Sequence, residues 1–311
     1  MPLNDYAALV SGVVCAGIGG ELFVRGAVGL AHWARVSPGI IGATVVGFAT
    51  SSPELAVSIS SAMAGKPQIA LGDALGSNVV NVALILALAL LVSGIRSPRD
   101  TVKRDFPVAL IVPVITGVLF LDGVLSRIEG LLLLGMFLSW LVAAIIEARK
   151  QRSAAERVLR EYRGWLAFAL CIVGLAFLGT AGHLIVTGAK GIASSFGVDE
   201  FVIGATIVAV GTSVPELATT VIAKLRGHDE VALGTILGSN IFNGLFIVAV
   251  AAVIFPISVE WREVAVALVF GLLAVVFTYP TRRGFLERRR GVLLLILYGV
   301  YLTAVIYPKA A

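Results

Sequence analysis

Residues 42–56 read GATVVGFATSSPELA, and residues 204–218 read GATIVAVGTSVPELA. A second pair follows at the same 162-residue offset, because LGDALGSNVVN at 71–81 is answered by LGTILGSNIFN at 233–243. Each copy of the first motif places a glutamate inside a long apolar stretch. A repeat of this kind predicts two halves of similar structure, each with a polar group in its interior.

The composition is that of a membrane protein. Hydrophobic residues make up 58% of the chain and charged residues 14%, whereas soluble domains carry roughly 25% charged residues. The mean hydropathy is +0.98. Because a membrane-spanning helix needs about 20 apolar residues, we predict ten spans. They cover residues 7–25, 39–64, 69–93, 104–121, 128–147, 164–188, 200–225, 230–255, 262–280 and 291–307.

The basic residues test this count, since cytoplasmic loops of membrane proteins carry an excess of Lys and Arg. With ten spans, 19 of the 24 Lys and Arg residues fall on one side. The opposite side holds only Lys66, Arg127, Lys190, Arg262 and Lys309. We therefore predict a multi-pass protein of the cell (inner) membrane with both termini facing outward. The net charge of +5 is explained by topology, without a nucleic-acid partner.

The predicted spans divide into two halves of five. Residues 1–147 form the first repeat, 148–163 a basic cytoplasmic linker and 164–311 the second repeat. An odd number of spans makes the second half enter the bilayer from the opposite side. The predicted fold is an all-α integral membrane protein with ten transmembrane helices in two inverted five-helix repeats. Such halves can exchange inward-open and outward-open states around one central site.

Two prolines are predicted to break the second and seventh spans. Pro53 cannot donate a hydrogen bond to the carbonyl of Ala49, and Pro215 cannot donate to that of Gly211. Broken backbone at membrane depth is tolerated where it lines a polar cavity. The residues around the two breaks are rich in oxygen ligands, namely Thr50, Ser51, Glu54, Thr212, Ser213 and Glu216.

Hydroxyl and carboxylate oxygens suit Ca2+ or Na+ better than zinc or copper. Residues four apart share a helix face, and four such pairs occur at matching positions: Thr50 with Glu54, Ser77 with Asn81, Thr212 with Glu216 and Ser239 with Asn243. A pocket lined by both glutamates carries a formal charge of −2, which one Ca2+ or two Na+ would cancel. The alternative is that both glutamates only pack between helices, but each costs ~2.5–3.5 kcal/mol to insert.

Other repeated or ionisable positions are less decisive. Asp73, opposite Thr235 in the repeat, is expected to cap the third span or to lie at the rim of a pore. Glu21 precedes Arg25 by four residues, which predicts a local ion pair. The matching glycines of 19–31 and 181–193 are expected to let helices pack closely.

The GATxxxxxTSxPEL and LGxxLGSNxxN segments resemble the two alpha-repeats of the cation/calcium exchanger superfamily, in particular the compact prokaryotic sodium/calcium exchangers. The resemblance covers nearly the whole chain. It implies that the first and sixth spans slide across the bundle, and that backbone carbonyls three residues before each Thr also bind the cation. The implied cation site consists of Glu54, Glu216, Thr50, Ser51, Ser77, Asn81, Thr212, Ser213, Ser239, Asn243, Gly47 and Ala209.

The sequence departs from the family pattern at Ala49, where glycine is usual, and has amides at both Asn81 and Asn243, where some relatives carry an aspartate. The proton-coupled branch resembles Gly-Asn-x-x-Glu, so the Thr-Ser-x-Pro-Glu motifs favour sodium.

We expect a monomeric antiporter that exchanges Ca2+ for Na+, without a cofactor. A proton-coupled cation exchanger is the nearest alternative, followed by a passive cation channel. An enzyme is not expected, because the spans lack HExxH or a Ser/His pair.

Overall fold

The computed structural model describes residues 2–65, 67–154, 164–195, 209–259, 261–281 and 284–306. These residues are mostly helical, as predicted. The helices of the first half, in which η denotes a π-helix, are α1 (Pro2–Ala34), α2 (Pro38–Ile41), η1 (Gly42–Val46), α3 (Gly47–Thr50), α4 (Ser52–Met63), α5 (Pro67–Val79), η2 (Val80–Leu86), α6 (Ala87–Val92), α7 (Arg99–Leu119) and α8 (Arg127–Ala154). Those of the second half are α9 (Gly164–Ser195), α11 (Ala209–Thr212), α12 (Val214–Leu225), α13 (Asp229–Ile241), η4 (Phe242–Ile247), α14 (Val248–Ile254), α15 (Trp261–Phe277) and α16 (Arg288–Ile306).

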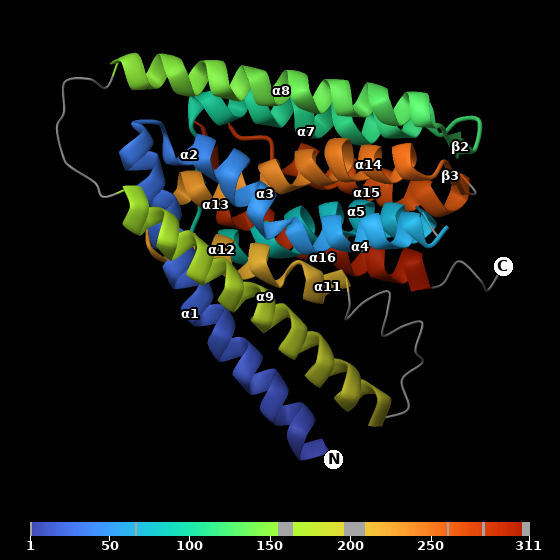
Figure 1. Ribbon diagram of the computed structural model, residues 1–311, viewed down its shortest axis with the longest axis horizontal. Coiled ribbons are helices and arrows are strands. Elements are labelled where there is room, and N and C mark those ends of the chain that lie inside the picture. The colour runs from blue at the N-terminus through green and yellow to red at the C-terminus, as the bar shows by residue number, and fades with distance from the viewer. Residues whose placement is uncertain are drawn as a thin grey trace.

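The helices that carry the two repeated motifs form the centre of the bundle. In Figure 1, α4, α5, α14, α15 and α16 run along the long axis beneath α7 and α8, while α1 and α9 lie side by side at a steep angle to them. In the most apolar 18-residue window of each span, 83% of the window is buried in Asp229–Ile254 and 67% in Pro67–Val92, but only 29% in Asn4–Ala34. The α5 and α13 regions are therefore core helices, and α1 is peripheral.

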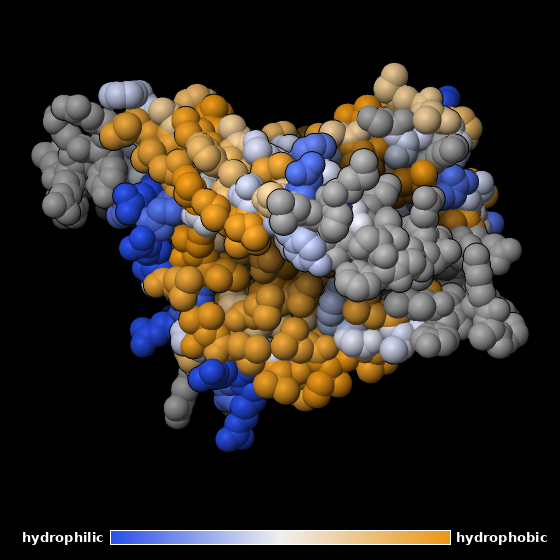
Figure 2. Space-filling model, turned by 90° about the horizontal axis from the view of Figure 1, so that it is seen from below, coloured by the Kyte–Doolittle hydropathy of each residue, from blue (hydrophilic) through white to orange (hydrophobic). Residues whose placement is uncertain are grey.

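The outer surface fits a lipid environment. Among the described residues, five helices are long and apolar enough to cross a membrane, or six if the bent pair Pro38–Thr50 and Ser52–Met63 counts as one span. Figure 2 shows a broad hydrophobic surface, with hydrophilic residues gathered mainly along one edge. The full ten-span arrangement stays a prediction.

Some helix ends differ from the predicted spans. α1 continues through Ala34, nine residues beyond the predicted end, because Arg25 pairs with Glu21 on the helix surface and does not terminate it. α8 likewise runs to Ala154, into the predicted linker. The first part of the predicted span 200–225 lies outside the described residues.

Besides its helices, the structure contains two short antiparallel strand pairs that the sequence did not predict. β1 (Ile95–Arg96) pairs with β4 (Phe285–Leu286), and β2 (Val124–Leu125) pairs with β3 (Ile257–Ser258). Two-residue strands have no periodicity that a sequence pattern could reveal. With the repeat offset, β1 corresponds to β3, so each half makes the same contact to the other.

A second reciprocal contact lies in the core. The Asn78 amide donates to the Asn240 carbonyl at 3.2 Å, and the Asn240 amide donates to the Asn78 carbonyl at 3.0 Å. These two residues are 162 positions apart. Contacts in which i meets j and j meets i are typical of two-fold symmetry, and this one joins equivalent positions of the repeated motif.

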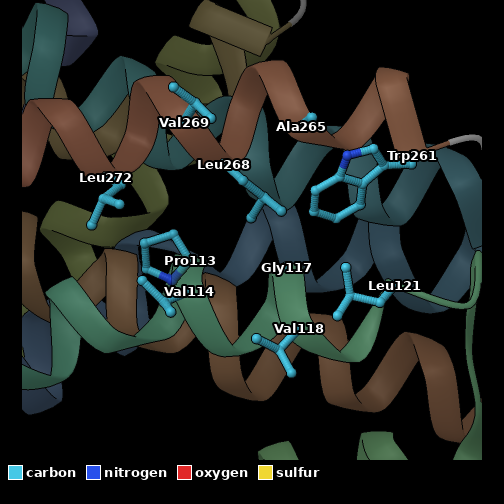
Figure 3. A pocket seen from close by; sticks show the side chains of 10 residues that line it. All are labelled: Pro113, Val114, Gly117, Val118, Leu121, Trp261, Ala265, Leu268, Val269 and Leu272. Carbon is cyan, nitrogen blue, oxygen red and sulfur yellow. The ribbon is translucent and has the colours of Figure 1, made fainter.

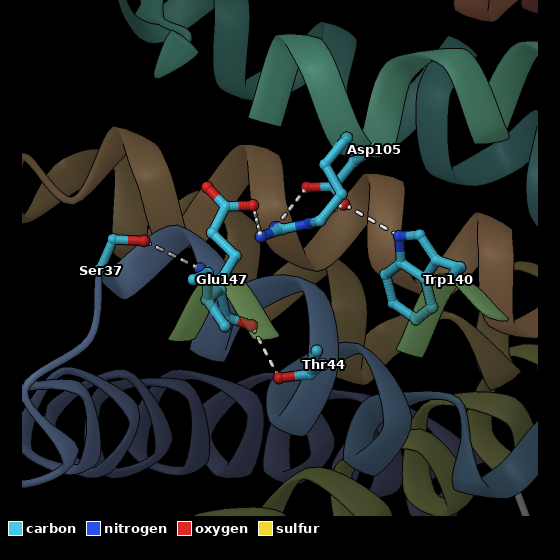
Figure 4. Close-up of polar contacts among 7 residues, drawn as sticks. Ser37, Thr44, Asp105, Trp140 and Glu147 are labelled. Carbon is cyan, nitrogen blue, oxygen red and sulfur yellow. Dashed lines mark hydrogen bonds and ion pairs between the residues drawn. The ribbon is translucent and has the colours of Figure 1, made fainter. Parts of the chain in front are cut away.

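A buried ion-pair network fixes α7 against α8 (Figure 4). The Arg104 guanidinium donates to both carboxylate oxygens of Asp105, at 2.7 and 2.8 Å, and to Glu147 at 3.1 Å. Trp140 Nε1 donates to Asp105 Oδ1 at 3.1 Å. Asp105 is fully buried, and these three donated bonds compensate its desolvation. The same figure shows Ser37, which caps α2 by accepting from the Ile40 amide.

Glycines bring α1 and α9 into direct backbone contact, at Gly26 as the sequence predicted and also at Gly174, which was not among the predicted glycines. A Cβ on Gly26 would lie 2.7 Å from the Cys171 amide nitrogen, and one on Gly174 would lie 2.6 Å from that of Phe23. Either distance is far below a normal contact. The two helices therefore pack as one close pair, in which larger side chains would not fit.

Candidate functional site

Both glutamates follow a break in their helix. The break between α3 and α4 falls at Ser51, with φ −84° and ψ 11°, and the break between α11 and α12 falls at Ser213, with φ −85° and ψ 10°. The first break bends the chain by 43°. Glu54 and Glu216 lie in the first turns of α4 and α12 and are fully buried. The predicted proline breaks thus occur at equivalent positions with nearly identical backbone geometry.

Hydroxyl groups of both halves meet at Glu216. Ser51 Oγ donates to Glu216 Oε1 at 3.0 Å, and Ser239 Oγ approaches the same oxygen at 3.3 Å. Thr50 Oγ1 lies 3.4 Å from Ser239 Oγ. The second span of the first half is therefore joined to the seventh and eighth spans of the second half by polar side chains.

A backbone carbonyl takes part in the same cluster. Ser239 Oγ and Thr50 Oγ1 both lie 3.4 Å from the Gly47 carbonyl oxygen. A Cβ on Gly47 would lie 3.0 Å from the Ser239 amide nitrogen, and one on Gly238 would collide with Ala43. Gly47 and Gly238 therefore allow α3 and η1 to approach α13 closely enough to place this carbonyl among the hydroxyls.

An amide layer lies next to the cluster. Asn81 Nδ2 donates to Asn240 Oδ1 at 3.1 Å, and Asn240 in turn bonds to the backbone of Asn78. Asn78 and Asn240 were not predicted as site residues, although both belong to the repeated LGSN motif and recur at the repeat offset. That recurrence inside a buried polar motif was the available signal.

Many polar atoms at the site lack a hydrogen-bond partner among the described residues. Buried polar groups are nearly always hydrogen-bonded, so a group of exceptions calls for an explanation such as an ion. The unpartnered atoms at the predicted site are Glu54 Oε1 and Oε2, Glu216 Oε2, Ser77 Oγ, Asn81 Oδ1, Ser213 Oγ and both side-chain polar atoms of Asn243.

The electrostatics favour a cation. The charge of Glu54 is acted on by two neighbouring carboxyls, those of Glu216 and Asp73. No group of three or more His, Cys, Asp or Glu side chains within metal-binding reach of one another occurs in the described part of the chain. The donors are instead hydroxyls, amides, carbonyls and two carboxyls, which is the oxygen set that Na+ and Ca2+ prefer.

Two predicted site residues, Thr212 and Ala209, lie in the short helix α11. Thr212 ends α11 and is half-buried, and Ala209 is the first residue of that helix. The segment before Ala209 lies outside the described residues. The contribution of these two residues stays a prediction.

The ionisable residues near the site differ from expectation in one case. Asp73 is the seventh residue of α5, so it does not cap the helix. Glu21 does pair with Arg25, at 2.5 Å, as predicted. It also pairs with Arg226 at 2.7 Å, which links α1 to the end of α12.

A separate apolar cavity of about 240 Å³ lies between α7 and α15 (Figure 3). Pro113, Gly117, Leu268 and Trp261 are among its walls, and no charged side chain lines it. It is distinct from the oxygen cluster and has no group that could hold a cation.

The fold and the oxygen cluster together define the class of protein, a helical membrane transporter for cations. The family model described as "Sodium/calcium exchanger protein" matches residues 5–146 and 166–307. The chain therefore belongs to the sodium/calcium exchanger family, which comprises transporters that exchange cations.

Individual relatives agree with this assignment. The chain is 41% identical to "Putative antiporter CaxA" of Alkalimonas amylolytica over 76% of each protein. It is 33% identical to "Inner membrane protein YrbG" of Escherichia coli strain K12, over 94% of this chain and 93% of that protein. Its fold matches a solved structure of the sodium-calcium exchanger NCX_Mj with a TM-score of 0.84, at 29% identity, over 99% of this chain and 100% of the other.

Proposed function

We propose that this chain is a secondary antiporter that exchanges Ca2+ for Na+ across a membrane by alternating access. The observation that carries the proposal is the buried cluster that contains Glu54 and Glu216, one from each half, and in which many oxygen atoms have no hydrogen-bond partner among the described residues. Two carboxylates give a charge of −2. One Ca2+ or two Na+ would neutralise it, so occupancy by one species opposes occupancy by the other.

Alternating access is supported by the way the halves contact each other. The strand pairs and the Asn78–Asn240 exchange repeat each contact with the halves interchanged. With five spans in each half, the second half would enter the bilayer from the opposite side, and this symmetry of contacts supports such an arrangement. A site between inverted halves can open to either side with nearly equal free energy.

The close pair α1 and α9 is the proposed moving element. Glycines set its two backbones in contact, and α1 is far less buried than α5 or α13. A rigid peripheral pair can slide over a buried core without disturbing the residues that hold the ion. The proposed cation ligands are the twelve residues named from the sequence, with Glu54 and Glu216 as the charged pair.

Sodium is the proposed coupling ion because the family description names it and because the solved NCX_Mj structure was obtained after soaking with Na+ and Sr2+. The test is 45Ca2+ uptake into vesicles reconstituted with purified protein. Sodium, potassium and proton gradients are imposed separately. Uptake should require the sodium gradient; uptake driven by a pH gradient alone would select the proton-coupled exchanger.

Two substitutions test the site itself. Glu54→Gln and Glu216→Gln keep the side-chain shape but remove a charge, so each should reduce sodium-driven uptake at least ~100-fold, which corresponds to about 2.7 kcal/mol. Glu287→Gln is the control, because Glu287 is exposed in the loop before α16. Normal uptake by both site variants would refute the assignment.

A further inference from the structure

The α4–α5 hairpin holds its polar residues at two heights. The chain reverses at Gly65, which has a φ of 71°. Glu54 lies 11 residues before this turn and Ser77 lies 12 residues after it. Ser58 lies seven residues before it and Asp73 eight residues after it. Because every helical residue rises about 1.5 Å, counts from the turn that differ by only one residue place residues of the two helices at nearly equal heights.

The second half confirms that this counting is valid. Its hairpin reverses at Gly227, with a φ of 75°. Glu216 and Ser239 lie 11 and 12 residues from that turn, and their side-chain oxygens are 3.3 Å apart. The residues at the second height there are Thr220 and Thr235.

Ser58 and Asp73 have the properties of unused cation ligands. Ser58 is fully buried, and its Oγ has no hydrogen-bond partner among the described residues. Asp73 Oδ2 is buried and also has none. Each lies four residues from a proposed ligand on its own helix, Glu54 or Ser77, and so on the same helix face. A negative charge on Asp73 acts electrostatically on the carboxyl group of Glu54.

The equivalent height in the second half is different. Thr235 Oγ1 donates to the Val231 carbonyl at 2.8 Å, so this hydroxyl is satisfied within its own helix. Neither Thr220 nor Thr235 can carry a negative charge. Only the hairpin of the first half therefore has a carboxylate one turn away from the central cluster.

We propose that Ser58 and Asp73 form an accessory cation site, one helical turn from the Glu54–Ser77 level and towards the α4–α5 turn. This inference rests on the proposed exchange function for its central site. A cation there lies about 6 Å from one held at Glu54, and the two repel each other. The accessory site thus receives cations from the face where the α4–α5 turn lies, and its filling promotes release from the central site.

The experiment measures half-saturating Ca2+ separately on each face, using vesicles in which the protein has one orientation. Asp73→Asn should raise this concentration roughly tenfold on the face of the α4–α5 turn and less than twofold on the other face. Thr235→Asp is the matched variant, because it places a carboxylate at the equivalent height of the second half. It should lower half-saturating Ca2+ on the opposite face.

A rescue variant separates a ligand from a structural residue. Adding Ser58→Asp to Asp73→Asn restores a carboxylate at the same height on the facing helix, and should return half-saturating Ca2+ to within about twofold of the unmodified protein. An unchanged Asp73→Asn variant, equal shifts on both faces or failure of the rescue would each overturn the accessory site. Retained exchange in Glu54→Gln and Glu216→Gln would overturn the central site instead, so the two failures are distinguishable.

Discussion

The two halves of the chain have matching residues at the central oxygen cluster but different residues at the flank, by which we mean α7 in the first half and α15 in the second. Glu54 and Glu216 follow breaks with the same backbone angles. On the flank, Arg104 and Asp105 form a buried ion-pair network, whereas the equivalent positions of the second half hold Val266 and Ala267. The site therefore needs matching residues from both copies, while each flank packs in its own way.

Matching residues at the centre are still not bonded alike. Glu216 Oε1 has Ser51 and Ser239 as hydroxyl partners. Neither oxygen of Glu54 accepts a hydrogen bond of standard geometry among the described residues, although the equivalent hydroxyl, that of Ser213, interacts with it. Two sequence-equivalent carboxyls in unequal settings are expected when one state of an alternating-access cycle breaks the symmetry of the halves.

The largest predicted effect concerns the flank of the first half. Asp105→Ala leaves the buried Arg104 with Glu147 as its only described acidic partner and leaves Trp140 without its acceptor. Removing one member of a buried ion pair costs about 3–5 kcal/mol. We expect a loss of unfolding free energy of that order, measured by thermal or denaturant unfolding of the purified protein in detergent.

The control imports the residues of the other half. Arg104→Val combined with Asp105→Ala reproduces the Val266–Ala267 pair and leaves no uncompensated guanidinium in the interior. Replacing a buried ion pair with apolar residues is often nearly neutral, so the double variant should recover most of the stability. A double variant as unstable as Asp105→Ala would mean that the flanks are not interchangeable.

The next prediction concerns the unequal hydroxyls at the centre. Ser51→Ala removes a donor to Glu216, and hydrogen bonds to charged groups contribute about 1.5–3 kcal/mol, so the Kd for Ca2+ should rise at least ~10-fold. Ser213→Ala, at the equivalent position, removes a proposed cation ligand that makes no hydrogen bond of standard geometry to Glu54, so it should raise the Kd less than Ser51→Ala does. Equilibrium binding of 45Ca2+ measures both. Equal effects would show that the observed asymmetry does not govern ion binding.

Much of the centre could be predicted from the sequence because it depends on the local conformation of the helices. A proline two residues after Thr-Ser must disturb the helix, and the breaks occur where Pro53 and Pro215 placed them. Glutamates and hydroxyls four residues apart must share a face. The internal repeat added the one long-range prediction, that polar residues of the two halves meet, as Ser51 and Glu216 do.

The remainder depends on contacts between distant segments. The strand pairing of Ile95 with Leu286 has no local signal. Asn240 became part of the site only through its bonds to Asn78 and Asn81. Asp73 was expected at a helix end or pore rim, and only the start of α5 at Pro67 excludes the helix end. The contacts of individual side chains were therefore harder to predict from the sequence than the secondary structure was.

The smallest predicted effect tests another difference between the halves. Phe106 and Tyr279 pack edge to face with ring centroids 5.6 Å apart. Their equivalents in the other half are Leu268 and Gly117, which leave the cavity between α7 and α15 (Figure 3). A Cβ on Gly117 would lie 3.5 Å from both Leu268 Cδ1 and Trp261 Cη2, at normal contact distance.

Gly117→Ala should therefore stabilise the protein, through a higher helix propensity of about 0.8–1.0 kcal/mol and through new contacts in the cavity. Gly135→Ala is the matched control, because Gly135 is exposed in the middle of α8 and a Cβ there would touch nothing within 4 Å. This control variant gains helix propensity but no new side-chain contacts. Thermal unfolding of both variants isolates the cavity contribution as their difference, which should be a few tenths of a kcal/mol in favour of Gly117→Ala. A smaller stabilisation by Gly117→Ala than by Gly135→Ala would mean that the space between α7 and α15 is already filled. The positions equivalent to Phe106 and Tyr279 would then leave no cavity.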